Sequence, residues 1–133
     1  MVRYNYNQQV QPPAPFIYVA VVAPDQTARV ERIPALIDTG ADITVIPRKL
    51  ITDLGLIKFS EIGVRGFRLR TQPLDTFLVR LHIHDWEIEA LEVIAEDESH
   101  CLLGRDLLNQ FLITLDGPGL SLEIRRSAKE TIA

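Results

Sequence analysis

The 133-residue sequence contains a single cysteine, Cys101, and no long apolar run. One cysteine cannot form a disulfide within the chain and is typical of reducing compartments. No stretch approaches the roughly 18 consecutive apolar residues that a transmembrane helix needs. The N-terminal residues are polar and rich in proline, unlike a secretory signal. We therefore expect a soluble cytoplasmic domain that has no contact with a membrane.

Excess positive charge and metal-binding patterns are also missing. The formal net charge is -4, which argues against a nucleic-acid partner because such proteins normally present a basic face. His82 and His84 share one face of a predicted strand, but no cysteine or carboxylate lies at a convincing ligand spacing, so we expect no metal site. Cys101 precedes two leucines and is interpreted as a small core residue. His100, its neighbour in a strand, would point away from it and could not activate a thiolate.

Most of the chain has the pattern of β-strands. The apolar residues Phe77, Val79, Leu81 and Ile83 occupy every second position, as in a half-buried strand. In the following apolar run the alternation changes phase, which predicts a β-bulge near Ala90. Turn residues at 24–26, 85–86 and 116–119 separate further strands, and the last of these turns predicts a C-terminal hairpin.

Only two short stretches have helical signals. The first is Pro47–Leu54, which begins with proline and stops at Gly55, and the second is Arg105–Asn109. The sequence therefore predicts an all-β, mainly antiparallel, closed-barrel-like fold with one or two short helices. We expect one domain over residues 16–126, a flexible N-terminal tail over 1–15 and a C-terminal tail over 127–133.

One segment, ALIDTGADITVIP at residues 35–47, places a carboxylate between two apolar strands. Asp38-Thr39-Gly40 has an ordinary reading as a loop, because Asp and Gly are common turn residues. A loop between two core strands is, however, expected to be half buried. Burying an ionised carboxylate costs several kcal/mol unless another group shares or neutralises its charge. Asp38 therefore needs a partner.

Three motifs together resemble the retropepsin-like aspartic proteases. They are ALIDTGADITVIP, IGVRGF at residues 62–67, and CLLGRDLLNQF at residues 101–111, and the resemblance covers roughly Phe16 to Leu115. It implies an acid-protease lobe that cleaves extended peptides without a cofactor. In that chemistry two carboxylates share one proton, so that one activates water while the other protonates the leaving group.

The chain supplies only one such loop. Asp75-Thr76-Phe77 lacks the glycine, and Leu115-Asp116-Gly117 lacks the hydroxyl. The second carboxylate must then come from another copy, with Asp38 facing its own equivalent across a two-fold axis. The sequence thus predicts a homodimer. The additional C-terminal hairpin extends past the end of the viral proteins, so the interface is expected to use different strands.

The resemblance also implies roles for individual residues. Asp38 would be the catalytic carboxylate, Thr39 would hydrogen-bond across the axis, and Gly40 would let the backbone approach the substrate. Arg105 would support the site through a buried or half-buried pairing with Asp42; its alternative is a surface charge. The substrate-binding residues implied by the resemblance are Ala41, Asp42, Val45, Gly63, Val64, Arg65, Gly66 and Leu103.

Several of these roles have alternatives. Val45 and Leu103 would line side-chain pockets, or they are plain core residues. Residues 63–66 would form the tip of a lid over the peptide, or an ordinary surface turn. For the whole protein, the alternative to an endopeptidase is a catalytically silent dimerisation or peptide-binding module with the same fold. The intact Asp-Thr-Gly favours catalysis, because a scaffold gains nothing from two apposed carboxylates.

Overall fold

The computed structural model describes residues 1–25, 27–63 and 73–126. Within these residues the chain forms ten strands and two short helices in two sheets. In chain order the elements are β1 (Val2–Asn5), β2 (Phe16–Val22), β3 (Arg29–Ile37), β4 (Val45–Pro47), α1 (Lys49–Leu54), β5 (Lys58–Ile62), β6 (Leu74–Ile83), β7 (Trp86–Glu96), β8 (Cys101–Leu103), α2 (Arg105–Leu108), β9 (Leu112–Asp116) and β10 (Ser121–Arg125).

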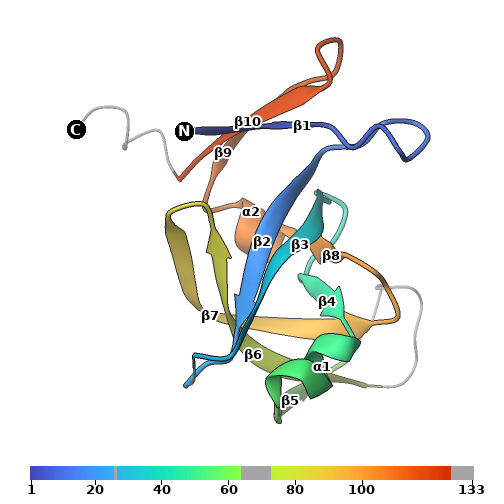
Figure 1. Ribbon diagram of the computed structural model, residues 1–133. Helices are drawn as coiled ribbons and strands as arrows, with labels where there is room; N and C mark the ends of the chain where they lie inside the picture. Colours follow the sequence, from blue (N-terminus) through green and yellow to red (C-terminus); the bar gives the residue numbers. More distant parts are fainter. Residues whose placement is uncertain (26, 64–72, 127–133) are drawn as a thin grey trace.

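The larger sheet closes into a barrel. Its seven strands run in the order β2-β3-β8-β4-β7-β6-β5, and a further pairing of β2 with β6 joins the ends and leaves β5 outside the closure (Figure 1). Most neighbours are antiparallel, while β3–β8 and β4–β7 are parallel. The predicted all-β, closed-barrel-like fold with two short helices is confirmed.

The alternation along β6 places its apolar residues inside the barrel. Val79, Leu81 and Ile83 are fully buried, while the residues between them are only partly buried. On the neighbouring strand, Val79 faces Leu91 but Leu81 faces Ile88, so β7 carries one extra residue between these pairs. This is the bulge predicted from the change of phase near Ala90.

The two helices are short, as the sequence predicts. α1 ends at Gly55, whose φ of 60° lies in the left-handed region and whose amide donates to the carbonyls of Ile51 and Thr52. α2 follows Gly104 directly. Neither of the two helices in the described parts of the chain is long and apolar enough to cross a membrane.

The N-terminal segment is ordered, in contrast to the expected flexible tail. β1 pairs with β10, with Tyr4 opposite Leu122. The amide of Tyr6 donates to the Leu120 carbonyl over 2.8 Å, and Pro15 accepts from the amide of Ile37 over 3.0 Å. The reason is long-range: β10 offers an edge that satisfies the backbone groups of β1. The other domain boundaries stay a prediction, and residues 127–133 lie outside the described residues.

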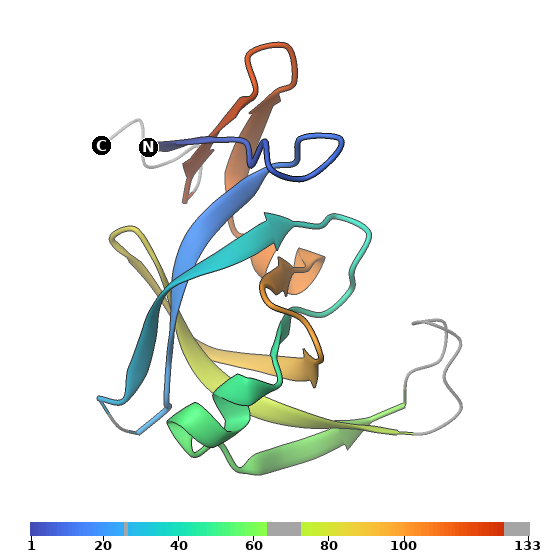
Figure 2. The same cartoon turned by 45° about the vertical axis from the view of Figure 1, so that its right-hand side comes forward.

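The predicted C-terminal hairpin is present as β9 and β10, and β1 completes a second sheet of order β1-β10-β9. Leu122 and Ile124 of β10 are almost fully buried in the core. Both views show this sheet at one end of the barrel and α1 with β5 at the other (Figures 1 and 2). We call the three strands the end sheet.

Candidate active site

Asp38 begins a tight loop at the end of β3. Its amide donates to the Leu103 carbonyl over 3.1 Å, which extends the β3–β8 ladder by one residue. The loop then turns back, because the Ala41 amide donates to the Asp38 carbonyl over 3.1 Å. The Asp38 carboxylate is half-buried and accepts a 3.0 Å hydrogen bond from the amide of Gly40. A Cβ on Gly40 would stand 3.3 Å from that same oxygen, so glycine leaves the carboxylate uncrowded.

A further set of hydrogen bonds, among Thr44, Gly104 and Asp106, supports this loop. The sequence-based predictions did not include it. Thr44 is fully buried; its hydroxyl donates to Asp106 Oδ1 over 2.8 Å and accepts from the Gly104 amide over 3.1 Å. Asp106 Oδ2 accepts from the Thr44 amide over 3.0 Å. The Leu107 amide also donates to Asp106, over 2.8 Å. Asp106 therefore ties the first turn of α2 to the strand that follows the Asp38 loop.

Gly104 allows α2 to contact the loop backbone directly. A Cβ at this position would lie 2.8 Å from the carbonyl carbon of Ile43 and 3.0 Å from the Ala41 oxygen. The next amide, that of Arg105, donates to the Ala41 carbonyl over 2.9 Å. The glycine is required here by close approach of two backbones.

The structure contains the expected pairing of Arg105 with Asp42, but at the surface. The two side chains are 46% and 73% exposed, so the expectation of a buried or half-buried pair is corrected. Arg105 Nη2 donates to Asp42 Oδ1, and Nη1 donates to the Thr39 carbonyl over 2.6 Å. An exposed ion pair contributes little to stability. Its effect on the shape of the loop is larger than its effect on stability, because the Arg105 guanidinium holds the loop at two points, Thr39 and Asp42.

The apolar residues near Asp38 that have exposed surface are not the ones predicted to line side-chain pockets. Val45 and Leu103 have no exposed surface, which supports their alternative reading as core residues. Leu36 and Leu102, opposite each other in the β3–β8 register, are half-buried instead. Because side chains alternate along a strand, Leu36 lies on the same side of β3 as Asp38. The alternation in CLL, with Cys101 and Leu103 inside, was the signal that could have identified Leu102.

The strands on either side of the predicted lid tip pair with each other, while the lid itself stays a prediction. β5 and β6 pair antiparallel, with Ile62 opposite Leu74 and Ser60 opposite Thr76. Gly63 follows β5, is exposed, and has open space where a Cβ would stand. Val64, Arg65 and Gly66 lie outside the described residues, so their contact with a substrate stays a prediction.

The surroundings of Cys101, His82 and His84 indicate structural roles for these side chains. Burial raises the pKa of the Cys101 thiol to about 12, so the thiol is protonated at neutral pH, in agreement with its expected core role. His84 is 47% exposed, whereas His82 is 28% exposed and lies 3.3 Å from Glu87. The hydrogen bond with His82 is the main cause that lowers the pKa of Glu87. The described residues contain no cluster of three or more histidine, cysteine or acidic side chains that could bind a metal.

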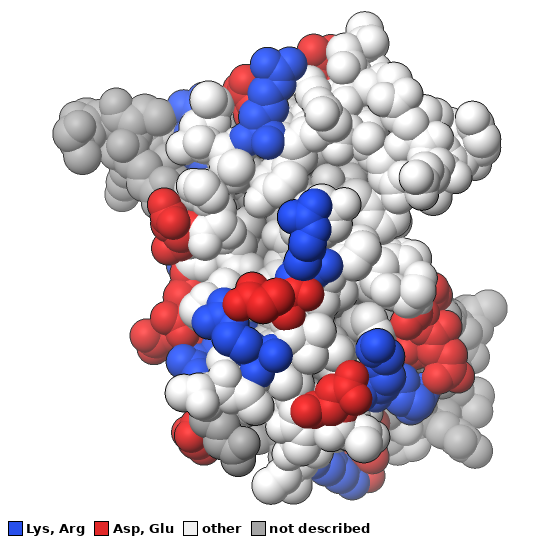
Figure 3. Space-filling view, viewed as in Figure 1, with Lys and Arg blue, Asp and Glu red and all other residues white. Residues whose placement is uncertain are grey.

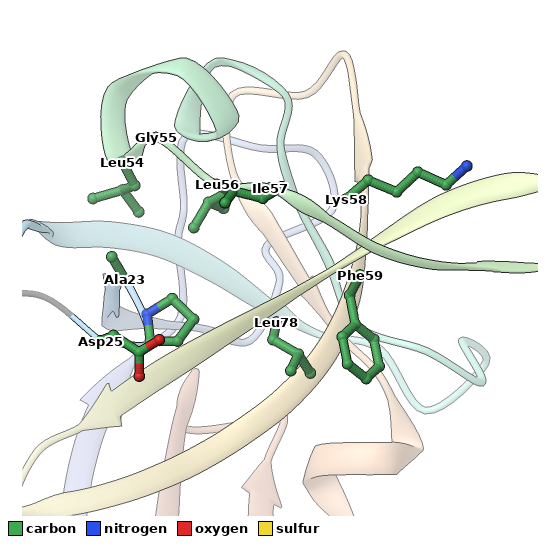
Figure 4. A pocket seen from close by; sticks show the side chains of 10 residues that line it. Ala23, Asp25, Leu54, Gly55, Leu56, Ile57, Lys58, Phe59 and Leu78 are labelled. Atoms are coloured by element: carbon green, nitrogen blue, oxygen red, sulfur yellow. The ribbon is translucent and has the colours of Figure 1, made fainter.

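A separate apolar pocket lies beside α1, β5 and the turn after β2. Its volume is about 360 Å³, and Leu54, Leu56 and Leu78 are among the residues that line it. Figure 4 shows the Lys58 side chain extending away from these leucines. Among the described residues that line it, Asp25 supplies the only carboxylate, so they form no pair of acids.

Comparison with known proteins identifies the family of this fold. The family model described as "gag-polyprotein putative aspartyl protease" matches residues 27–110, which include the Asp38 loop, the β5–β6 hairpin and α2. The chain is a member of the retropepsin-like aspartic proteases. No curated protein sequence matches it.

Two solved structures illustrate the shared fold of this retropepsin-like chain. A retropepsin-like aspartic protease from Rickettsia conorii aligns with a TM-score of 0.60 and 17% identity, covering 91% of this chain and 86% of that one. The retroviral protease-like domain of Ddi1 from Leishmania major aligns with a TM-score of 0.50 and 17% identity, covering 85% and 90%. At this identity the likeness establishes the fold alone.

Proposed function

We propose that this protein is an aspartic endopeptidase whose active site forms between two copies of the chain. The observation that carries the proposal is the Asp38 loop: a half-buried carboxylate at the end of a core strand, braced by Gly40 and supported by α2. The two partial copies of the motif are engaged elsewhere. Thr76 is buried and donates to Glu92 over 2.6 Å, and Asp116 accepts from the Gly119 amide over 2.9 Å. A second Asp38 is therefore the natural partner.

Two Asp38 carboxylates side by side supply both an acid and a base. At about 3 Å and an effective dielectric near 20, two negative charges repel by roughly 5 kcal/mol. The pair consequently retains one shared proton over a wide pH range. The ionised carboxylate takes a proton from the water that attacks the peptide carbonyl, while the protonated carboxylate gives its proton to the carbonyl oxygen. When the C–N bond breaks, the first carboxylate passes the proton from water to the leaving nitrogen, and the second recovers a proton from a hydroxyl of the gem-diol.

The surroundings of Asp38 suit an extended peptide. Asp42 and Ala41 lie on the same loop, and Leu36 and Leu102 provide half-buried apolar surface next to it. We expect the loop to bind substrate main chain and the leucines to favour apolar side chains at the cleaved bond. The β5–β6 hairpin would close over the peptide and exclude water. A cytoplasmic location stays a prediction from the sequence.

The alternative is a silent dimerisation or peptide-binding module, and one experiment separates the two. Wild type, Asp38→Asn and the matched control Asp75→Asn are incubated with a peptide library, and products are read by mass spectrometry. Asp75 is an exposed aspartate on β6 that pairs with Lys58 at 3.5 Å. We expect cleavage by wild type and Asp75→Asn only. Binding of peptides without cleavage by any of the three would favour the module.

A further inference from the structure

A cavity of about 380 Å³ lies on the outside of the barrel, over β2, β3 and the turn that follows β6. The described residues that line it include two arginines, two histidines and one acid, which are Arg29, Arg32, His82, His84 and Glu31. We call it the basic cavity. Its lining comes from the barrel and not from the end sheet. Arg32 precedes Asp38 by six residues of an extended strand, or roughly 20 Å, so the cavity is separate from the candidate active site.

Ala20 forms the floor of the basic cavity. On β2 it lies opposite His82 of β6, and Tyr18 shares its side of the strand. The valines before and after Ala20 are buried in the core, so Tyr18, Ala20 and His82 are on the outer face of the barrel. Ala20 is nevertheless only 5% exposed, because longer side chains surround it. The cavity therefore results from one short side chain among long ones.

A β-bulge brings Arg32 to the edge of the basic cavity. The register of β3 against β2 shifts at this point, so that residues 31 and 32 stand opposite Ala20 alone. The guanidinium carbon of Arg32 lies 4.4 Å from the centre of the Tyr18 ring. This cation–π contact holds the guanidinium over the ring. The bulge thus presents a cation beside the cavity in a defined position.

The backbone is strained on both sides of the basic cavity. Arg32 has a φ of 56° and His84 a φ of 53°, in the left-handed region that disfavours residues with a Cβ. Among the other described non-glycine residues, only Leu120 has a positive φ. Strained residues persist where the surrounding structure holds them, and they cluster at binding sites. Two such residues beside one cavity indicate that the cavity receives a ligand.

The charges of the lining show which kind of ligand fits. Within the described residues Arg32 forms no ion pair, whereas Arg29 Nε pairs with Glu31 Oε1 at 2.7 Å. Arg29 Nη2 lies 3.4 Å from His82 Nδ1, which places a second guanidinium beside the floor. With both histidines neutral, the lining still has one positive charge more than it has negative charges. Figure 3 shows basic and acidic side chains together on this face, over β2 and β3.

We propose that the basic cavity binds a phosphate group, either as the free anion or as a small phosphomonoester. A guanidinium can only donate hydrogen bonds, and Arg32 and Arg29 offer theirs from different positions around Ala20. A tetrahedral phosphate has oxygens to accept from both, whereas a planar carboxylate is satisfied by one guanidinium. Glu31 is 64% exposed, so its side chain can turn into solvent when phosphate takes its place at Arg29. Such a site is independent of peptide cleavage and goes beyond the proposed function.

Calorimetric titration of the whole chain with inorganic phosphate, and separately with glycerol phosphate, tests the site at physiological ionic strength. Arg32→Gly removes the guanidinium and suits the positive φ, so the fold should be retained. The loss of a charged donor should weaken phosphate binding by about tenfold or more. The matched control is Arg48→Gln, which removes an exposed arginine that pairs with Asp97 at 2.9 Å outside the cavity. This control should bind phosphate as tightly as wild type.

Glu31→Gln tests the site in the opposite direction. It removes the carboxylate that competes for Arg29, so phosphate should bind more tightly than to wild type. Tighter binding of glycerol phosphate would identify a phosphomonoester site, and equal or tighter binding of inorganic phosphate a site for the free anion. Wild type that binds neither ligand at millimolar concentration would overturn the proposal. So would unchanged affinity in Arg32→Gly, an equal loss in Arg48→Gln, or affinity that does not rise in Glu31→Gln.

Discussion

The contact between Gly104 and the Asp38 loop makes Gly104→Ala an informative perturbation. An added Cβ would stand 2.8 Å from the Ile43 carbonyl carbon, whereas ordinary contacts begin at 3.4 Å. One backbone must therefore move by about 0.6 Å. The closest atom, the Ile43 carbonyl carbon, belongs to the main chain of the loop, and the Ala41 oxygen and Asp106 Oδ1 each lie 3.0 Å from the new methyl. Overpacking of this kind typically costs about 1–3 kcal/mol, because the closest contact is with backbone and not with the end of a flexible side chain.

The expected result has a thermal and a catalytic part. For a domain of this length, 1 kcal/mol corresponds to about 4 °C in Tm, so Tm should fall by about 4–12 °C in a calorimetric scan. Since the shift acts on the residues that follow Asp38, kcat/KM should fall by about tenfold or more. Gly117→Ala is the matched control, because no atom lies within 4 Å of its added Cβ.

A Gly104→Ala variant with unchanged Tm and activity would refute this reasoning. It would mean that α2 does not press against the loop as closely as the structure shows. A lower Tm with full activity would refute only the catalytic part, since the strain would then relax away from Asp38.

Three further predictions concern the support of the loop and the thiol. Thr44→Val removes the hydroxyl that joins Gly104 to Asp106, and should lower the free energy of unfolding by about 1–3 kcal/mol in urea denaturation; Thr114→Val, on the exposed face of β9, should change it far less. Arg105→Ala should change the free energy of unfolding by less than about 1 kcal/mol, because the ion pair is exposed. It should nevertheless reduce kcat/KM, because Thr39 is released. A loss of stability as large as the loss of activity would contradict a positioning role. Cys101 should resist a thiol reagent at pH 8 until the chain unfolds. Because burial raises the pKa of the Cys101 thiol in the folded protein to about 12, the unfolded chain loses the thiol proton first as pH rises above about 9. The free energy of unfolding should therefore decline with pH, and it should decline less in Cys101→Ala.

The parts of the fold that the sequence predicts are those set by local patterns. The alternation along β6 reports directly which side faces the core, and the bulge in β7 appears as a change of phase. The end of α1 at Gly55 follows from one residue that tolerates a positive φ. Each of these features depends on neighbours in the sequence, so no knowledge of the tertiary arrangement is needed.

The missed features depend on partners far along the chain. The segment before β2 is ordered because β1 finds β10, with Val2 facing Ile124. Thr44 and Asp106 meet only after β4 and α2 come together, 62 residues apart. Neither pairing leaves a local pattern, since a polar N-terminus and an aspartate in a first helical turn are common in surface segments. The degree of exposure of Arg105 and Asp42 is likewise a property of the assembled loop.

Mixing active and inactive subunits tests the central claim most directly. Wild type and Asp38→Asn are combined at constant total concentration, left to exchange, and assayed for peptide cleavage as the wild-type fraction is varied. If each site needs two intact Asp38 carboxylates, activity follows the square of that fraction, so a half-and-half mixture retains about a quarter of full activity. Activity directly proportional to the wild-type fraction would show that one chain suffices, and would contradict a shared active site.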